Sequence, residues 1–486
     1  MDKIISGYSK KYPNVSLNQL KRVIYHNLNK SSFKKSSNYI STYIIKEISK
    51  YLDILTLIKL SQVSKLFKDS VKIINFTKID SKSINITDEI LQLPIFNNLQ
   101  SLYASKKTKI TNEGIKNLKL IELDASKNSF ITDVSWMTSL QILYARGYSG
   151  ITDQGIEKLK LIHLDVSNNP NITDVSWMTS LQILDASGES EINNKGIKNL
   201  KLTTLNISYN PNITSKGLKN FNLIRLDSAG NEKINDLSWM TNLRILNVTD
   251  NSIITNNVIK NLKLIELYVD DCPNITDVSW MTTLQILHST GINNNNIRNL
   301  NLIELISPNN PKITDVSWMT NLQILDASGK SGITTQGIKN INLVKLYAYD
   351  NPNITDVSWM TNLQILDAHG KSGINNRGIK NLQLKKLKAY DNPNITDVSW
   401  MTNLQILNAS GKSRISDSGI QNLKLTNLNA SDNPYITDVS VSSMKTLHTL
   451  IANGTSGITD KGIKNLKLKK LNAFDNPNIT YDLINN

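Results

Sequence analysis

The chain has 486 residues, of which 39% are hydrophobic and 6% aromatic, and its formal net charge is +15. Its single cysteine, Cys272, excludes a disulfide framework, and no stretch approaches the roughly 20 consecutive apolar residues that a membrane-spanning helix needs. Because the first residues also lack a sustained apolar run, we expect no signal peptide, no membrane contact, and a cytoplasmic or nuclear location.

The excess of positive charge does not by itself indicate a nucleic-acid partner. Most lysines recur in segments of the type Gly-Ile-Lys-Asn-Leu-Lys-Leu, one or two at a time, so they spread along one flank of the protein. Dispersed charge gives only weak, salt-sensitive and non-specific attraction to phosphates. We therefore expect no specific nucleic-acid binding.

Residues 1–38 form a basic and polar N-terminal extension. Apolar residues at helical spacing predict one amphipathic helix in it: Leu17, Leu20, Val23, Ile24 and Leu28. We interpret this extension as a solvated tail or as a cap for the first rung of the repeats.

Residues 39–80 predict a small helical domain. Its first helix carries apolar residues at helical spacing: Ile44, Ile45, Ile48 and Leu52. A second short helix carries Leu57 and Leu60, and Ser64 is placed as the N-cap of a third helix, which carries Phe67 and Val71. About forty residues cannot bury this much apolar surface alone, so we expect a partner to cover part of it.

This domain resembles an F-box, the motif that docks a substrate receptor on the Skp1 adaptor of cullin–RING ubiquitin ligases. The family begins Leu-Pro-x-Glu-Leu-Leu; here Ile40 and Ser41 take the first two places, and Ile44 and Ile45 take those of the two leucines. The segments Tyr-Leu-Asp at 51–53 and Val-Ser-Lys at 63–65 match the family, whereas both of its prolines are replaced. The resemblance implies a Skp1-like adaptor and a cullin complex as partners. The adaptor contacts that it implies are Ile40, Ile44, Ile48, Leu52, Leu57 and Leu60.

Residues 81–486 are a repeat array. Seven tryptophans share the context Val/Leu-Ser-Trp-Met-Thr, from Trp136 to Trp400, at spacings of 41, 62, 41, 38, 41 and 41 residues. Each 41-residue period contains two rungs of 20 or 21 residues, and each rung begins with an isoleucine. Two rungs without tryptophan, from Ile192 and Ile213, explain the long spacing, and a three-residue deletion before Ile292 explains the short one. A fixed period of this kind is typical of a solenoid that binds partners along a surface.

Within a rung, the pattern Leu425-x-x-Leu428-x-Ala430-x-x-Asn433 alternates with period two, which predicts a short strand followed by a turn. The asparagine side chain in that turn is expected to bond to backbone groups of adjacent rungs. This pattern resembles the leucine-rich repeat. It implies an α/β repeat solenoid of nearly twenty rungs, a horseshoe with parallel strands on its concave face. Together with the preceding segment, the chain resembles F-box/leucine-rich-repeat proteins, similar to those of giant DNA viruses of amoebae.

The repeat register gives structural roles to several residues that otherwise look functional. Cys272 stands where other rungs have the turn asparagine, so we interpret it as a structural residue and not as a nucleophile. The tryptophans are expected to pack on the convex side. Glycines of the alternate rungs are expected to leave room for them: Gly155, Gly196, Gly337, Gly378 and Gly419.

The candidate target-binding site lies where concave positions depart from a small polar background. Many rungs place serine in the last concave column, as at Ser187, Ser208, Ser328, Ser410 and Ser431. Three consecutive rungs instead carry aromatic and basic residues, and adjacent strands lie about 4.8 Å apart. The predicted patch comprises Lys345, Tyr347, Tyr349, Ile365, Asp367, His369, Lys386, Lys388 and Tyr390. Tyrosine and cationic side chains are common anchors of protein interfaces, so we expect this patch to bind an acidic segment of a target protein.

These observations favour a non-catalytic substrate receptor of an SCF-type E3 ubiquitin ligase. One structural cysteine and five scattered histidines supply neither a thioester-forming site nor a zinc-binding RING domain, and no phosphate-binding loop or hydrolase motif is present. We expect no enzyme activity, no cofactor and no metal. The alternative is a leucine-rich-repeat scaffold or decoy that binds a host protein without ubiquitin transfer.

Overall fold

The computed structural model describes residues 53–63, 65–76, 86–106 and 108–480, together with Ile45 and Ser49. The chain divides into two compact units, Met1–Lys201 and Leu202–Asn486, which are described separately below. The predicted helix at residues 17–28 and the predicted N-cap Ser64 lie outside the described residues.

Unit 1 begins, in its described part, with the helical segment that precedes the repeats. Ile45 and Ser49 are helical, and helices α4 (Ile54–Val63) and α5 (Lys65–Ser70) confirm the second and third predicted helices. Asp53 caps α4, since its side chain accepts a hydrogen bond from the Thr56 backbone at 2.9 Å. Helix α5 ends at Ser70, so the buried Val71 lies just beyond it and not within it as predicted.

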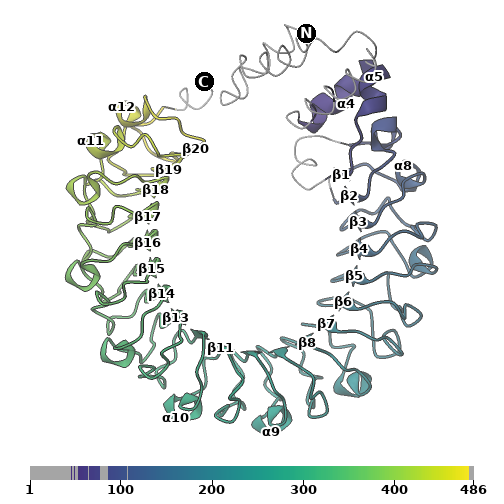
Figure 1. The fold of residues 1–486 in the computed structure, drawn as a ribbon, viewed down its shortest axis with the longest axis horizontal. Helices are drawn as coiled ribbons and strands as arrows, with labels where there is room; N and C mark the ends of the chain where they lie inside the picture. The colour runs from purple at the N-terminus through teal and green to yellow at the C-terminus, as the bar shows by residue number, and fades with distance from the viewer. Residues whose placement is uncertain are drawn as a thin grey trace, which may run out of the picture. The chain divides into compact units, whose positions relative to one another are not determined.

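The repeats of unit 1 form a parallel sheet whose strands pair in chain order. The strands lie on the inner side of the unit and the helical turns on its outer side (Figure 1). The strands are β1 (Asn75–Phe76), β2 (Ser101–Tyr103), β3 (Glu122–Asp124), β4 (Ile142–Tyr144), β5 (His163–Asp165) and β6 (Ile183–Asp185). The turns are α7 (Asp88–Leu91), η1 (Pro94–Phe96), α8 (Asn112–Ile115) and η2 (Gln154–Ile156).

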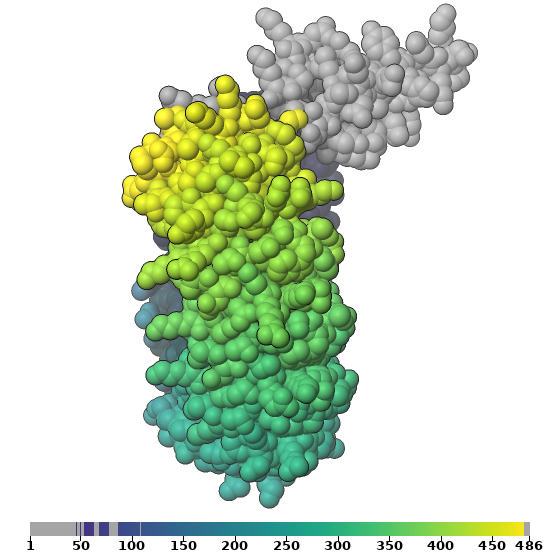
Figure 2. Space-filling model, turned by 90° about the vertical axis from the view of Figure 1, so that its left-hand side faces the viewer, coloured from purple at the N-terminus to yellow at the C-terminus, as the bar shows by residue number. Residues whose placement is uncertain are grey.

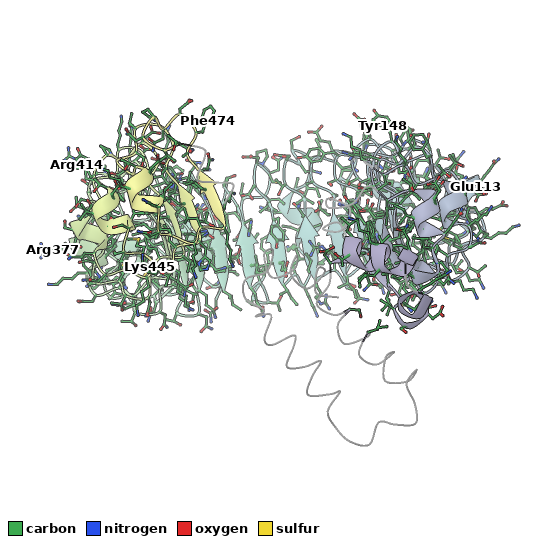
Figure 3. All side chains as sticks on the ribbon, turned by 90° about the horizontal axis from the view of Figure 1, so that it is seen from above. Glu113, Tyr148, Arg377, Arg414, Lys445 and Phe474 are labelled. Atoms are coloured by element: carbon green, nitrogen blue, oxygen red, sulfur yellow. The ribbon has the colours of Figure 1, made fainter. Side chains whose placement is uncertain are left out.

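Unit 2 continues the same pattern. Its strands are β7 (Thr204–Asn206), β8 (Arg225–Asp227), β9 (Ile245–Asn247), β10 (Glu266–Tyr268), β11 (Ile286–His288), β12 (Glu304–Ile306), β13 (Ile324–Asp326), β14 (Lys345–Tyr347), β15 (Ile365–Asp367), β16 (Lys386–Lys388), β17 (Ile406–Asn408), β18 (Asn427–Asn429), β19 (Thr449–Ile451) and β20 (Lys470–Asn472). Its helical turns are η3 (Ser215–Leu218), α9 (Asn256–Ile259), α10 (Asn294–Ile297), η4 (Gln336–Ile338), η5 (Arg377–Ile379), η6 (Ser418–Ile420), α11 (Asp438–Val441) and α12 (Asp460–Ile463). Figure 2 shows the later rungs of this unit stacked from teal to yellow, and Figure 3 shows Arg377 of η5 projecting away from the strands.

The period-two pattern explains the strands and the core. Strands β2 to β20 each have a central leucine that points toward the core of the rung, while its two neighbours face the concave surface. In β14, for example, Leu346 is fully buried between the half-buried Lys345 and Tyr347. The isoleucine that begins each rung is also buried, with exposures from 0% at Ile86 to 4% at Ile479. These layers of leucine and isoleucine form one continuous core within each unit, as expected for stacked repeats.

The turn asparagines bond as predicted. Asn392 is fully buried, and its Nδ2 donates to the carbonyls of Ala368 at 2.7 Å and Ile374 at 3.1 Å. Its Oδ1 accepts from the backbone of Asn394 at 2.9 Å. Ala368 belongs to the preceding rung and Ile374 begins the rung of Asn392, so this side chain joins two rungs by satisfying buried backbone groups.

The helical turns and the tryptophans occupy different rungs. Each described helical turn of the repeats lies in a rung without tryptophan, and the tryptophan segments are simple turns. The tryptophans are partly exposed, and Trp359 donates its Nε1 hydrogen to the carbonyl of Ile341 at 3.1 Å.

The predicted role of the alternate-rung glycines is wrong. A Cβ on Gly378 would lie 2.1 Å from the carbonyl oxygen of Thr355, and the Gly378 carbonyl accepts from the Val357 backbone at 2.9 Å. The nearest atoms are thus the backbone of the preceding rung and not a tryptophan ring. The same close contact with a Thr-Asp backbone recurs at Gly155, Gly196, Gly337 and Gly419.

Candidate functional site

Several rungs of unit 2 carry a polar residue of the middle concave column that bonds to a serine of the last column in the same rung. The Oδ1 atom of Asp326 accepts both the backbone N–H of Ser328 at 3.0 Å and its hydroxyl at 2.5 Å. Asn408 and Ser410 form the same pair, with distances of 3.2 and 2.7 Å. This small polar background presents few unused groups to a partner.

The strands β14, β15 and β16 bring the predicted patch together. Their register aligns Lys345 with Ile365 and Lys386 in the first column, and Tyr347 with Asp367 and Lys388 in the middle column. The last column holds Tyr349, His369 and Tyr390, which follow the three strands. We call these nine residues the Tyr–His–Lys patch.

The last column of the patch is a continuous stack of three rings. The Tyr349 and His369 rings lie 4.6 Å apart with an interplanar angle of 9°. The His369 and Tyr390 rings lie 3.9 Å apart at 14°. Stacked rings hold one another in place, so this surface loses little conformational freedom when it binds a partner.

Asp367 fixes the position of the middle ring of the stack through a contact with His369. Its carboxylate is only 2% exposed and contacts His369 Nδ1 at 2.5 Å and Lys388 Nζ at 2.8 Å. The hydrogen bond to Asp367 raises the pKa of Lys388, and burial together with the Asp367 charge raises the pKa of Tyr390. Both side chains therefore keep their protons near neutral pH and remain hydrogen-bond donors.

Two cations of the patch remain available to a partner. Among the residues that the structure describes, neither Lys345 nor Lys386 forms an ion pair. Both are half-buried and lie on either side of Ile365. A carboxylate or phosphate on a partner is the complementary group.

Two further aromatic clusters were missed by the sequence interpretation, because it compared only the last column. In unit 2, the rings of Tyr268 and His288 lie 4.5 Å apart in the middle column. In unit 1, Arg146 lies 5.1 Å from the centre of the Tyr144 ring and forms an ion pair with Asp165 at 2.6 Å. Tyrosines in the middle column were the signal that could have found both clusters.

Cys272 occupies the asparagine position, as predicted. Its Sγ contacts the carbonyl of Val248 at 2.9 Å, and Val248 lies 24 positions earlier, just as Ala368 does relative to Asn392. Burial raises the pKa of the Cys272 thiol to about 11, which opposes the thiolate that a nucleophile requires.

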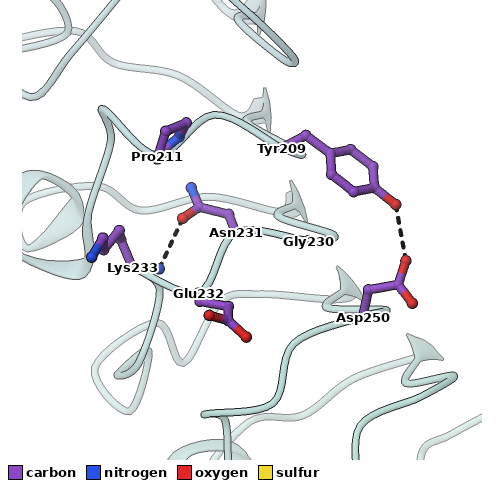
Figure 4. A pocket seen from close by; sticks show the side chains of 7 residues that line it. All are labelled: Tyr209, Pro211, Gly230, Asn231, Glu232, Lys233 and Asp250. Carbon is purple, nitrogen blue, oxygen red and sulfur yellow. Dashed lines mark hydrogen bonds between the residues drawn. The ribbon is translucent and has the colours of Figure 1, made fainter.

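A shallow pocket of about 560 Å³ lies at the edge of unit 2, where two rungs without tryptophan follow one another (Figure 4). Tyr209 has a φ of 56°, unusual for an aromatic residue, and its hydroxyl donates to Asp250 at 2.9 Å. Its ring crosses Gly230, where a Cβ would lie 2.2 Å from a ring carbon. Pro211, Asn231, Glu232 and Lys233 complete the lining, which thus combines apolar surface with charged side chains.

The predicted adaptor contacts are only partly described. Leu57 and Leu60 lie on α4 and are half-buried, Ile58 is buried, and Leu55 is 39% exposed. Helix α4 therefore retains apolar surface. The other four predicted contacts, Ile40, Ile44, Ile48 and Leu52, lie outside the described residues.

Two features are absent from the described part of the chain. No helix there is long and apolar enough to cross a bilayer. No cluster of three or more His, Cys, Asp or Glu side chains there has the geometry to hold a metal ion.

Comparison with known proteins identifies the N-terminal segment. Residues 40–79 match the family model described as F-box domain. No curated protein sequence matches the chain.

Among solved structures, the chain is similar to several at low sequence identity. The TLR13–ssRNA13 complex has 17% identity and a TM-score of 0.36, and the match covers 86% of this chain but only 64% of that one. The mouse RP105/MD-1 complex has 15% identity and a TM-score of 0.40, covering 78% and 71% of the two chains. The yeast Rad7–Elc1 complex has 15% identity and a TM-score of 0.32, covering 94% and 97%. The family match and the rung geometry together show an F-box domain at residues 40–79, followed by a parallel-strand solenoid of the leucine-rich-repeat type.

Proposed function

We propose that this chain is a non-catalytic substrate receptor of an SCF-type E3 ubiquitin ligase. The observation that carries the proposal is an F-box domain at residues 40–79 in the same chain as a repeat solenoid with a preorganised concave patch. In this proposal the F-box docks a Skp1-like adaptor and its cullin complex, and the repeats hold the target protein. Catalysis is supplied by the conjugating enzyme, and the receptor contributes by raising the effective concentration of the target near it.

The target site of this proposal is the Tyr–His–Lys patch. Its three stacked rings supply rigid anchors, and Lys345 and Lys386 supply positive charge that has no ion-pair partner among the described residues. Aromatic anchors within a polar surround are the usual centres of binding energy in protein interfaces. We infer that the patch binds an acidic segment of the target.

The adaptor site of this proposal is the apolar surface of the F-box. Leu57 and Leu60 on α4 would contact the adaptor together with four residues before them: Ile40, Ile44, Ile48 and Leu52. The partial exposure of α4 leucines supports a covering partner.

We also infer a source and a location. The bias toward Asn, Ile and Lys and the near-identical rungs support a place among the repeat proteins of giant DNA viruses of amoebae. In that case the adaptor and the target belong to the host, and the chain acts in the host cytoplasm or nucleus.

The adaptor contact is tested by capture with the tagged full-length chain, read for Skp1 and cullin. A charge buried without a partner is costly, so Ile48→Lys combined with Leu57→Asp should abolish adaptor capture. The matched control is Lys59→Asp with Gln62→Lys, which changes two exposed positions of α4. Unchanged capture by the Ile48/Leu57 double variant would remove the adaptor function and leave a scaffold or decoy that binds its target without ubiquitin transfer.

The target site is tested with a second double variant. Tyr349→Ala with Tyr390→Ala removes both outer rings of the stack and should weaken target binding by about 2 kcal/mol or more. Adaptor capture should stay intact. The control is Ser410→Ala with Ser431→Ala, in the same column on the following rungs. Full target binding by the tyrosine variant would place the recognition surface elsewhere on the repeats.

A further inference from the structure

A second Tyr–His pair lies on the concave face of unit 2, four strands before the stacked rings. Tyr268 on β10 and His288 on β11 face each other at 4.5 Å with an interplanar angle of 59°. Tyr268 donates its hydroxyl to Glu266 at 3.0 Å, and His288 Nε2 lies 3.3 Å from Glu304 on β12. The surroundings of this pair are thus acidic, where those of the later stack are basic.

Four carboxylates make up what we call the acidic patch: Glu266, Asp270, Glu304 and Asp326. They lie on, or directly after, the strands β10, β12 and β13. In the described part of the chain, no lysine or arginine forms an ion pair with any of them. Asp367 in the Tyr–His–Lys patch differs, because Lys388 compensates its charge.

The carboxylates of this acidic patch are partly buried, and His288 is the basic side chain in contact with one of them, Glu304. Burial raises the pKa of Asp270; the nearby His288 opposes this shift, and the charges of Asp271, Asp250 and Asp326 add to it. Burial also raises the pKa of Asp326. The Asp270 Oδ1 atom is buried and has no hydrogen-bond partner. A cationic partner would relieve this repulsion, and the Tyr268 ring offers it an aromatic face.

The spacing of the two surfaces suits one extended peptide. From β11 to β15 there are four strand spacings of about 4.8 Å, or roughly 19 Å. An extended chain advances about 3.3–3.6 Å per residue, so about six residues bridge the two surfaces.

We propose that the concave face of unit 2 binds an extended, bipolar segment of the target protein. A basic block of the segment lies over Glu266 and Glu304, and an acidic block about six residues away lies over the Tyr–His–Lys patch. The reversed orientation sets like charges against one another, so the charge pattern fixes the direction of the bound segment. The acidic patch also repels phosphates, which disfavours the binding of a nucleic acid along this face. The acidic-block half of this inference rests on the function proposed above.

The test uses fluorescence anisotropy with the full-length chain and synthetic fluorescein-labelled peptides. One peptide carries three arginines and three glutamates whose block centres are six residues apart. Two others have either the arginine or the glutamate block replaced by serine. We expect the bipolar peptide to bind about tenfold or more tightly than either single-block peptide, with an affinity that falls as salt is added. A bipolar peptide that binds no more tightly than the better single-block peptide would overturn the inference.

Charge reversal assigns the basic block to its surface. Glu266→Lys with Glu304→Lys should abolish the advantage of the bipolar peptide over the glutamate-block peptide. The control, Asn427→Lys with Thr449→Lys, adds two positive charges in the same column on β18 and β19, the same charge change as Glu266→Gln with Glu304→Gln, and should keep that advantage. An equal loss in both variants would contradict the assignment. The milder Glu266→Gln with Glu304→Gln should reduce the advantage in the same direction, which covers the case in which the lysine variant does not fold.

The two proposals fail in distinguishable ways. If the Tyr–His–Lys patch is not a binding site, the glutamate-block peptide does not respond to Tyr349→Ala with Tyr390→Ala. In that case bipolar recognition is also overturned, even where the arginine-block peptide still depends on Glu266 and Glu304. If the patch binds but bipolar recognition is wrong, the glutamate-block peptide responds to the tyrosine variant, and the added arginine block gives no gain.

Discussion

Replacement of Asn392 by alanine tests how the rungs are joined. The side chain satisfies two buried carbonyls, those of Ala368 and Ile374, and the part-buried N–H of Asn394. An unsatisfied buried group costs about 1–3 kcal/mol. One nitrogen serves both carbonyls, and water entering the vacated space recovers part of the loss. We therefore expect Asn392→Ala to lower the free energy of unfolding by about 3 kcal/mol.

The assay is urea unfolding of the full chain, combined with hydrogen exchange read on individual rungs. Neighbouring repeats are coupled only to one another, so the loss of protection should be greatest in the rungs that carry β15 and β16. Asn394→Ala is the matched control, because that side chain is exposed. The loss of stability in Asn392→Cys should lie between the losses of these two variants. In the native chain, Cys272 occupies the equivalent position and keeps the bond to the carbonyl 24 positions earlier. Equal effects of Asn392→Ala and Asn394→Ala would refute the reasoning.

Four further outcomes are expected. Leu366→Ala should cost about 2–5 kcal/mol in urea unfolding, because the side chain is fully buried in the rung core. Gly378→Ala should lower the unfolding midpoint, because its Cβ would meet the Thr355 carbonyl oxygen at 2.1 Å, whereas alanine at the exposed Lys380 should not. The Cys272 thiol should resist a disulfide reagent at pH 8 until the chain unfolds, because burial raises its pKa to about 11. Since this folded-state pKa lies above the ordinary value of 9.0, the thiol's contribution to stability is complete below pH 9 and is lost as the pH rises toward 11. A midpoint unchanged by Gly378→Ala, or rapid labelling of native Cys272, would contradict these expectations.

The sequence by itself determined the repeat and its register. The period-two pattern around Leu366 and the recurring rung-start isoleucines specify a strand and a buried layer through local geometry alone. Because every rung repeats that geometry, residues about twenty apart could be aligned, and their spacing alone assigned Tyr349, His369 and Tyr390 to one column. The role of Cys272 followed from the same alignment.

Only the tertiary structure decided how side chains on different rungs meet. It showed that Asp367 binds both His369 and Lys388, which depends on rotamers and on distances across strands that no spacing rule contains. It also showed that Gly378 faces the backbone of the preceding rung and not a tryptophan, because the close approach of rungs is set by stacking. The acidic patch and the Tyr–His–Lys patch differ in charge balance, and this difference likewise depends on which charged side chains lie close together in space. Periodicity is a local property that the sequence displays directly, whereas the compensation of charge is a property of the packed rungs.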